Sequence, residues 1–479
     1  MPQSQFCSEV IKSSGIAFGT SGARGLVEGF THDVCVAFTL AFVDVMKGNF
    51  GFERIAIGID RRPSSPAMAS ACIGAAQTAG LKVDFYGVLP TPALALQSMK
   101  DKIPAIMITG SHIPFDRNGI KFYRPDGEID KQDEAMILAS NALFLNSRPV
   151  DVTVNERASL GYLERNTQGL SRDLLKDMKI GLYEHSAAGR DLNRQIFESL
   201  GADVISLERT ETFVPVDTEA VSEEDYAKGK AWSNEYKLDL IVSTDGDGDR
   251  PLVADENGYW VRGDVLGLIA ARYLGIDALA VPVSCNSSIE ASGMFGEVAR
   301  TRIGSPYVIE GMKSLANNYQ TVAGFEANGG FLLHTPAQFG DSMVAPLPTR
   351  DAILPALALI VSAKQQSMTP SQLVDKVSKR YTASGRLQAC PTDQSRSLLQ
   401  LWSQDTASFL AQLNIESEVA DVNTIDGVRF TLTNGNVVHL RPSGNAPELR
   451  VYCEAATENS AKEMVEQHLK TLATLPELS

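Results

Sequence analysis

The stretch Thr109-Gly-Ser-His-Ile-Pro-Phe-Asp-Arg-Asn-Gly-Ile-Lys-Phe122 decides how the rest of this sequence is interpreted. The apolar run 104–109 before it predicts a buried strand that stops at Gly110, and Ser111 follows at once. A hydroxyl at the end of a buried strand can be held in a cleft by the rigid structure behind it. Ser111 is therefore a candidate nucleophile.

Cationic and proton-carrying groups surround this serine in the sequence. His112, Arg117 and Lys121 lie close to it, and Asn118-Gly119 is a turn signal that would bring Lys121 towards it. Such a surround suits phosphoryl transfer. A polar loop in which Ser111 and His112 only bond to backbone fits the same residues.

Composition excludes several classes of partner. The chain has 479 residues, 44% hydrophobic and 21% charged, with a formal net charge of -15. Because no Lys/Arg-rich run stands out, we expect no nucleic-acid partner and no anionic membrane surface. The longest apolar stretch, 352–363, is too short to span a bilayer and contains Pro355. An anionic small ligand remains compatible, since a local basic cleft can lie inside an acidic protein.

The cysteines and the N-terminus indicate a cytoplasmic protein. No CxxC pair is present, and the scattered thiols are typical of a reducing compartment rather than of a disulfide framework or zinc site. The start of the chain lacks a basic region followed by a long apolar run, so we expect no signal peptide. The six cysteines are Cys7, Cys35, Cys72, Cys285, Cys390 and Cys453.

Strands alternate with helices along most of the chain, which indicates an α/β fold with mostly parallel sheets. The pattern restarts after a polar, weakly patterned segment, 151–167, interpreted as the first domain boundary, and again near Tyr259. A helix is expected from Arg350, interrupted at Pro355, and a hairpin around Asn434-Gly435 belongs to a last unit. The predicted domains are 1–150, 151–257, 258–368 and 369–479.

An acidic loop, Asp245-Gly-Asp247-Gly-Asp249-Arg250, follows the predicted strand 238–244. Carboxylates at alternate positions can converge on one hard cation, and Mg²⁺ fits a site that leaves room for a phosphate. A helix-loop-helix calcium site is a rival, but Arg250 stands where that loop needs glycine, and the flanks look like strands. A solvated acidic turn would also fit these carboxylates, as would an aspartyl-phosphate hydrolase, although the hydrolase leaves the Ser111 loop unexplained.

Three more loops carry groups suited to a phosphorylated sugar. The glycine-rich stretch 17–25 ends near Arg24, which could form a fork with a phosphate. Glu326-Ala-Asn328 offers an acceptor and a donor side by side, which suits adjacent hydroxyls. The turn 441–445 offers a guanidinium, a hydroxyl, an amide and backbone N–H groups to a phosphate. For each of these loops, an ordinary flexible loop or turn is the alternative interpretation.

Taken together and in this order, the four loops resemble those of the bacterial phosphohexomutases of the phosphoglucomutase/phosphomannomutase superfamily, over essentially the whole chain. The resemblance implies three similar α/β mixed-sheet domains and a smaller C-terminal α+β domain around a central cleft. It implies that Ser111 is a phosphoserine whose phosphate shares Mg²⁺ with Asp245, Asp247 and Asp249. The remaining implied site residues are His112, Lys121 and Arg24 in catalysis and Arg250, Glu326, Asn328, Arg441, Ser443, Gly444 and Asn445 in substrate binding.

The sugar loop departs from the family pattern. Many relatives read Gly-Glu-x-Ser-Gly-His, whereas Asn328 stands here in place of the serine and Gly330 in place of the histidine. The loop at Ser305-Pro306-Tyr307 likewise lacks a His-Lys pair that is common in some relatives. The group that replaces the histidine at Gly330 is not evident from the sequence.

The resemblance implies an isomerase of carbohydrate metabolism that interconverts hexose 6-phosphate and hexose 1-phosphate, with mannose or glucose as the sugar. It would act through a phosphoserine and a hexose 1,6-bisphosphate that is both intermediate and activator, as a monomer or dimer. Three rival functions fit less well: a mutase dominated by glucose phosphate, a phosphoglucosamine mutase, and a phosphosugar phosphatase or binding protein that does not isomerise.

Overall fold

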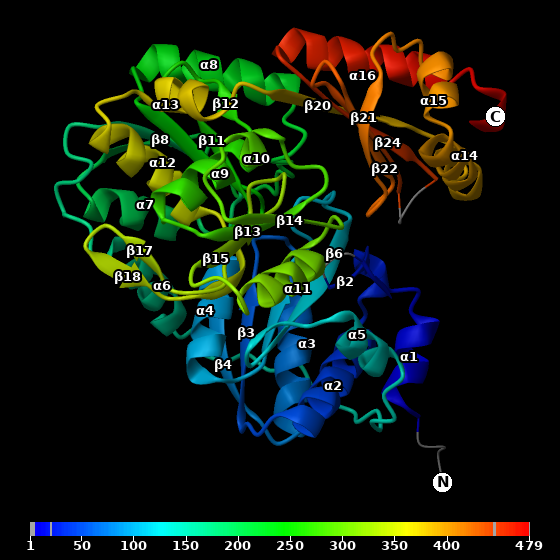
Figure 1. The fold of residues 1–479 in the computed structure, drawn as a ribbon. Helices are drawn as coiled ribbons and strands as arrows, with labels where there is room; N and C mark the ends of the chain where they lie inside the picture. The colour runs from blue at the N-terminus through cyan, green and yellow to red at the C-terminus, as the bar shows by residue number, and fades with distance from the viewer. Residues whose placement is uncertain (1–4, 20–21, 444–446, 479) are drawn as a thin grey trace.

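The computed structural model describes residues 5–19, 22–443 and 447–478, which form four units (Figure 1). The first unit contains a seven-stranded sheet in the order β1-β2-β6-β5-β3-β4, with β7 paired to β6. Its elements are α1 (Cys7–Ser13), β1 (Ala17–Phe18), β2 (Ala23–Leu26), a 3-10 turn (Val27–Gly29), α2 (His32–Asn49), β3 (Arg54–Ile59), α3 (Ser65–Thr78), β4 (Lys82–Val88), α4 (Thr91–Asp101), β5 (Ala105–Ile108), β6 (Arg117–Arg124), β7 (Gly127–Glu128) and α5 (Lys131–Leu138).

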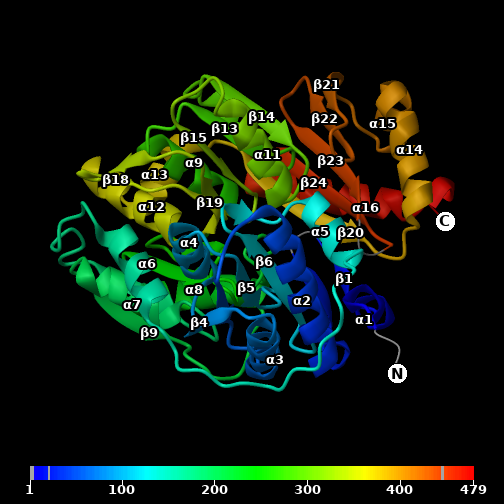
Figure 2. The same ribbon diagram turned by 90° about the horizontal axis from the view of Figure 1, so that it is seen from below.

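Alternation along β3 shows why this sheet is covered on both faces. Ile55 and Ile57 pack with α2 and α3 in one apolar core, while Ala56 between them belongs to a second core that includes α4. Helices α2 and α3 lie together at one side of this unit (Figure 2). The second core continues through the second and third units, whereas the fourth unit has an apolar core of its own.

The second unit contains a five-stranded sheet in the order β12-β11-β10-β8-β9. It begins with a helix, α6, in the weakly patterned segment that was interpreted as the first domain boundary. Ala158 and Tyr162, four residues apart, bury the inner face of this helix. Its elements are α6 (Arg157–Thr167), β8 (Lys179–Tyr183), α7 (Arg190–Ser199), β9 (Asp203–Leu207), α8 (Glu223–Tyr236), β10 (Leu240–Thr244), β11 (Pro251–Ala254) and β12 (Trp260–Val261).

The third unit contains a five-stranded sheet in the order β14-β13-β15-β16-β19 and a separate hairpin, β17-β18. Its elements are α9 (Gly263–Tyr273), β13 (Ala278–Pro282), α10 (Ser288–Ala291), β14 (Glu297–Thr301), α11 (Ser305–Leu315), β15 (Val322–Phe325), β16 (Phe331–Leu333), β17 (Ala337–Phe339), β18 (Ser342–Val344), β19 (Leu347–Asp351), α12 (Ile353–Gln365) and α13 (Pro370–Val377). Helix α13 contacts α9 and α12, so it packs with this unit.

The helix expected from Arg350 begins later. Arg350 lies in β19, and α12 starts at Ile353 with Pro355 in its first turn. A proline is tolerated there because the first N–H groups of a helix have no partner within it. The helix itself is present, and only its predicted start was wrong, because the apolar run 352–363 continues the β19 sequence without a turn residue.

The fourth unit is an antiparallel sheet in the order β20-β24-β23-β22-β21, with the predicted hairpin at β22-β23. Helix α16 contacts β20 and β24. Its elements are β20 (Tyr381–Leu387), α14 (Thr392–Gln404), α15 (Thr406–Gln412), β21 (Val419–Asn423), β22 (Val428–Leu432), β23 (Val437–Pro442), β24 (Leu449–Ala455), α16 (Glu458–Leu472) and a 3-10 turn (Pro476–Leu478).

The first three sheets share one topology. In each, three neighbouring strands are parallel and a fourth is antiparallel to the last of them: β4-β3-β5 then β6, β9-β8-β10 then β11, and β14-β13-β15 then β16. The sheets are therefore mixed, and the expectation of mostly parallel pairing fails beyond β5. The loop at the switch from parallel to antiparallel carries Ser111, the Asp245–Asp249 triad and Glu326 in turn. The repeated fold thus places the three loops that carry these candidate site residues at equivalent positions in their sheets.

Within the described residues, no helix is both long and apolar enough to cross a membrane.

Candidate active site

Ser111 lies in a strained turn directly after β5. Its φ is 54°, in the left-handed region that residues other than glycine rarely adopt, and its side chain is fully buried. The Ser111 N–H donates to Oγ1 of Thr109 at 2.8 Å, which holds this turn. The hydroxyl Oγ donates to Oδ2 of Asp245 at 2.6 Å. The predicted nucleophile therefore contacts the predicted metal loop.

The turn signal at Asn118-Gly119 does not form a turn. Both residues lie inside β6, where the Asn118 amide donates to the hydroxyls of Ser64 and Ser65 at the start of α3. The chain reverses earlier, within 110–116. The role of Asn118 is to link β6 to α3 by these hydrogen bonds.

Arg62 holds the Ser111 loop from behind. Its guanidinium donates to four backbone carbonyls at 2.6 to 2.9 Å, those of Ser111, Ile113, Pro114 and Arg117. The Arg62 side chain is fully buried, lies 3.2 Å from the Asp60 carboxylate and stacks over Phe213 at 4.0 Å from the ring centre. Gly110 allows this approach, because a Cβ there would lie 2.7 Å from the guanidinium carbon.

The acidic triad forms a compact and buried group. One oxygen from each of Asp245, Asp247 and Asp249 lies within 4.8 Å of the others, and all three residues are fully buried. The Oδ1 atoms of Asp247 and Asp249 have no hydrogen-bond partner. Buried carboxylate oxygens without partners are costly unless a cation meets them, so the donor set fits a hard divalent ion such as Mg²⁺.

Electrostatics within the triad also favour a cation. Burial, and after it the neighbouring Asp247 and Asp249 carboxylates, raises the pKa of Asp245 well above its usual range. Burial opposes ionisation of Asp247 too, but the Lys121 ammonium beside it lowers the pKa of Asp247 below its usual range. A divalent ion here would relieve the repulsion that raises the pKa of Asp245.

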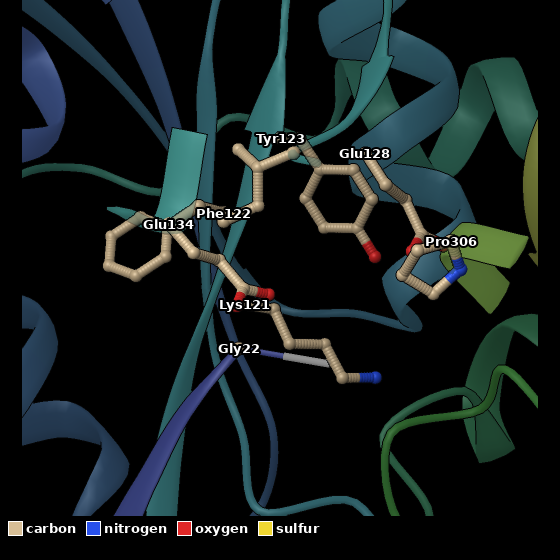
Figure 3. Close-up of a pocket in the computed structure, with 8 residues that line it drawn as sticks. Gly22, Lys121, Phe122, Tyr123, Glu128, Glu134 and Pro306 are labelled. Carbon is tan, nitrogen blue, oxygen red and sulfur yellow. The ribbon is translucent and has the colours of Figure 1, made fainter. Parts of the chain in front are cut away.

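Lys121 contacts two carboxylates of the triad. Its Nζ lies 2.5 Å from Oδ2 of Asp247 and 2.7 Å from Oδ2 of Asp249, and only 3% of the residue is exposed. Figure 3 shows Lys121 and Gly22 at one side of a small pocket that Glu128 and Pro306 line at the other. Glu128 accepts hydrogen bonds from Ser305 and Thr349 of the third unit, at 2.8 and 2.6 Å, and so ties the first unit to the third.

His112 and Arg250 form a pair beside the serine. The Nδ1 of His112 accepts from the Arg250 guanidinium at 2.9 Å and lies 3.4 Å from Oγ of Ser111. Burial, and after it the Arg250 charge, lowers the pKa of His112 to about 3. His112 is therefore neutral near pH 7, with its remaining N–H on Nε2 available as a donor.

Arg24 contributes charge to the same region from β2. Burial and the nearby Arg250 and Arg350 charges lower the pKa of Arg24 to about 10, while Asp247 and Asp249 oppose that shift. Arg24 is thus still cationic near pH 7 and adds positive potential beside the triad.

The sugar loop joins the site through a residue that sequence reasoning missed. Glu326, 5% exposed, accepts from the Arg350 guanidinium at 3.0 Å, and Arg350 also contacts Oδ2 of Asp249 at 3.0 Å. Asn328 orders its own loop, because its Oδ1 accepts from the Gly330 N–H at 3.0 Å. The carbonyl of Asn328 accepts from the Thr218 hydroxyl in the second unit, also at 3.0 Å.

The phosphate loop predicted in the fourth unit is described in part. Arg441, at the end of β23, donates to the Asp426 carboxylate at 2.8 Å, and the same carboxylate accepts from the Ile303 N–H at 3.0 Å. The Ser443 N–H donates to the carbonyl of Glu448 at 2.8 Å. The predictions for Gly444 and Asn445 lie outside the described residues. Asp426 thus connects Arg441 to the loop that precedes α11.

The structure brings Ser111, His112, Lys121, Arg250, Glu326 and the triad into one connected set of contacts. Arg62 and Arg350 complete that set, and neither belongs to a motif. A signal for Arg62 was present, since it lies in the loop just after the buried strand β3, and a charged residue that is buried there needs a partner.

Comparisons with known proteins agree with this geometry. Models of the phosphoglucomutase/phosphomannomutase family match its α/β/α domains I, II and III at residues 15–142, 161–258 and 262–381, and its C-terminal domain at 397–470. The chain is 52% identical over 465 residues to a phosphomannomutase of Salmonella muenchen, covering 97% of both chains. It is 42% identical to a phosphomannomutase of Sinorhizobium fredii, with 96% of this chain and 99% of the relative covered.

A solved structure agrees in fold. A phosphoglucomutase/phosphomannomutase family protein from Burkholderia thailandensis superposes with a TM-score of 0.74 at 18% identity, over 96% of this chain and 98% of that one.

Proposed function

Because the chain belongs to the phosphoglucomutase/phosphomannomutase family, an isomerase family that interconverts hexose phosphates, we propose that it exchanges the 6-phosphate and 1-phosphate of mannose and of glucose through phospho-Ser111. The observation that carries this proposal is the 2.6 Å contact between Oγ of Ser111 and Oδ2 of Asp245. It places a strained, buried hydroxyl against the buried acidic triad, as transfer of a phosphoryl group beside a divalent ion requires.

The reaction is an exchange of one phosphoryl group. A free hydroxyl of the hexose phosphate attacks the phosphorus of phospho-Ser111, a new P–O bond forms, and the bond to Oγ breaks. The proton of the attacking hydroxyl ends on Oγ, which leaves Ser111 as a free hydroxyl. The resulting hexose 1,6-bisphosphate reorients within the site, so that its other phosphoryl group faces Ser111 and is returned to it. Released bisphosphate accounts for the role of this compound as activator, because it can rephosphorylate Ser111.

The proposed roles follow the contacts. Asp245, Asp247 and Asp249 would hold Mg²⁺, which when bound offsets charge on the phosphoryl oxygens. Lys121, paired with two carboxylates, acts as a fixed cation that stabilises the transferred group. Neutral His112 can donate from Nε2.

The second set of roles concerns binding. Arg24 and Arg250 supply positive charge next to the serine, and Arg250 also fixes His112. Arg441, Ser443, Gly444 and Asn445 grip the phosphate that is not transferred. This grip must accept either phosphate of the bisphosphate, so it reads the phosphate and not the carbon that bears it.

Dual activity on mannose and glucose phosphates follows from the sugar loop. Glu326 offers acceptor oxygens and Asn328 an amide, which suit hydroxyls at C3 and C4. The two sugars share these positions and differ at C2. The proposed dual activity is tested by measuring catalytic efficiency on mannose 1-phosphate and on glucose 1-phosphate, with glucosamine 1-phosphate as a third substrate.

A phosphosugar phosphatase or binding protein that does not isomerise is the alternative from another class. The intact Ser111 turn and triad favour the mutase. A coupled mutase assay with a trace of hexose 1,6-bisphosphate separates them: release of inorganic phosphate without isomerised product would overturn the mutase proposal.

We further propose a cytoplasmic location, a monomer or dimer, and domain boundaries near residues 150, 257 and 368. The supporting observation for the location is that all six cysteines are buried free thiols. Because α13 packs with the third unit, the last boundary is best tested with fragments that begin at 369 and at 378. Light scattering coupled to size exclusion measures the oligomeric state.

A further inference from the structure

Gly330 leaves space that another residue of this chain fills. A Cβ built on Gly330 would lie 2.6 Å from both Cγ and Cδ of Arg350 and 3.0 Å from its Cβ. Gly330 does not need glycine for its backbone, because it is not among the glycines with positive φ. The absence of a side chain at Gly330 is therefore a requirement of packing, and the aliphatic part of Arg350 meets it.

Arg350 also connects two of the chemical loops. From β19 its Nε and Nη2 each lie 3.0 Å from Oδ2 of Asp249, while Nη1 lies 3.0 Å from Oε2 of Glu326. Only 1% of Arg350 is exposed. One planar guanidinium thus spans the triad loop and the sugar loop, a geometry that the single ammonium of lysine does not reproduce.

These contacts leave specific oxygens available. Arg350 and Lys121 occupy Oδ2 of Asp249, and Oδ1 of the same carboxylate has no hydrogen-bond partner. At the other end, the guanidinium engages Oε2 of Glu326. Arg350 therefore contacts one oxygen of each carboxylate, and the second oxygen of Asp249, 3.7 Å from Nε of Arg250, can still meet a ligand.

We propose that Arg350, accommodated by Gly330, is a positioning residue for hexose recognition: it fixes the Glu326 carboxylate for the sugar hydroxyls and couples that carboxylate to the phosphoryl-transfer loop at Asp249. This inference rests on the proposed function of the sugar loop. It also answers what stands in place of the family histidine, since a permanently charged arginine fills that space. Arg350 orients the carboxylates and does not carry the proton of the reacting hydroxyl, because a guanidinium remains protonated in proteins.

The first test replaces Arg350 by lysine, with a matched control. Arg165 is also a buried arginine paired with a carboxylate, at 3.0 Å from Asp351, the next residue along β19. We expect Arg350→Lys to lower kcat/KM about 100-fold, since two charge-assisted contacts are lost, and Arg165→Lys to change it less than about threefold, as its partner lies outside the site.

Deoxy sugars measure the recognition of individual hydroxyls, which would stay unchanged if Arg350 only stabilised the fold. Wild type should discriminate against 3-deoxy or 4-deoxy mannose 1-phosphate relative to mannose 1-phosphate. That discrimination should shrink towards unity in Arg350→Lys and persist in Arg165→Lys. Intact mass should show that Arg350→Lys still accepts a phosphate on Ser111 from hexose 1,6-bisphosphate, which demonstrates a folded nucleophile loop.

The second test concerns Gly330. Gly330→Ala should lower kcat/KM in the wild-type background, because its methyl group displaces Arg350. The same substitution should cost little further in an Arg350→Ala background, where the space is vacant. This non-additivity ties the effect to the contact between the two residues.

The outcomes separate this inference from the proposed function. A wild type without mutase activity would refute the proposed function. An active wild type, with Arg350→Lys equal to Arg165→Lys in kcat/KM and in its discrimination between hydroxyls, would overturn the role of Arg350 alone. Additive costs of Gly330→Ala and Arg350→Ala would overturn the packing argument.

Discussion

The hydroxyl of Ser111 donates to the carboxylate of Asp245 at 2.6 Å, although the two residues are 134 positions apart in the chain. They belong to different sheets but to the same kind of loop, at the switch from parallel to antiparallel pairing. The contact means that phosphorylation of Ser111 places the phosphate directly against the triad. Changes on either side should therefore affect the chemistry more than the fold.

Ser111→Ala should abolish turnover while the protein remains folded, since alanine keeps the Cβ and removes only the phosphoryl acceptor. Intact-mass analysis should show one phosphate on wild type after treatment with glucose 1,6-bisphosphate and none on the variant. Circular dichroism should give the same spectrum for both. Near-normal turnover in the variant would contradict a covalent mechanism.

Asp247→Asn should weaken Mg²⁺ binding at least tenfold, because it removes one of three anionic ligands and leaves Lys121 with Asp249 alone. Isothermal titration with MgCl₂ measures the affinity without relying on activity. Glu235→Gln on the surface of α8 is the control and should bind as wild type does. Equal affinities for the two variants would place the ion elsewhere.

Glu326→Gln should lower catalytic efficiency on mannose 1-phosphate and glucose 1-phosphate by a similar factor. The lost charge-assisted bond is worth roughly 1.5–3 kcal/mol, which corresponds to about 10- to 100-fold. The measurement is kcat/KM for both sugars with both proteins. A variant that loses one activity and keeps the other would show that the loop senses C2.

Acid should destabilise the fourth unit through His439. Burial lowers the pKa of His439 to about 4, while its Nε2 lies 2.7 Å from the carbonyl of Asp426. Its unfolded pKa is about 6.5, so between pH 6.5 and 4 the unfolded state binds the proton and the folded state does not. Stability therefore falls as the pH drops through this window, by about 1.4 kcal/mol per pH unit at most.

His439→Gln keeps an N–H donor and removes that titration. In urea unfolding at pH 7 and pH 5, the variant should lose less stability than wild type, by about 2 kcal/mol. His185 and His468, whose pKa values burial also lowers to about 4, remain in both proteins and cancel in the comparison. An identical loss in both proteins would mean that His439 does not contribute to acid sensitivity.

Arg62→Lys should lower kcat, and its effect on kcat should be larger than its effect on KM. Lysine cannot reach four carbonyls at once, so the Ser111 turn loses its support while the sugar and phosphate loops remain. Transfer of phosphate from glucose 1,6-bisphosphate to the variant, followed by intact mass, should be slower. Arg61→Lys, the neighbouring and partly exposed arginine, is the control. An unchanged phosphorylation rate would contradict the role of Arg62.

Local patterns predicted the strands and loops that carry Ser111, the triad and Glu326, because apolar runs ending at glycine and polar residues are short-range signals. Arg350 and Arg62 could not be assigned in the same way, since their partners are distant in sequence and lie on other elements. The helix α6 was missed because its inner face needs few apolar residues, and the helix α12 was started too early at Arg350. Tertiary contacts decide these cases, and Asn118 shows that they also override a turn dipeptide.

The contacts of Arg62 determine when the Ser111 loop becomes ordered: during folding and not during substrate binding. A single buried guanidinium fixes the carbonyls at both ends of the reversal that contains Ser111. The conformational entropy of that segment is consequently lost once, when the chain folds, and is not lost again in each catalytic cycle. The serine meets every incoming sugar in one orientation, and the strain at its φ of 54° is sustained by the folded core rather than by substrate binding.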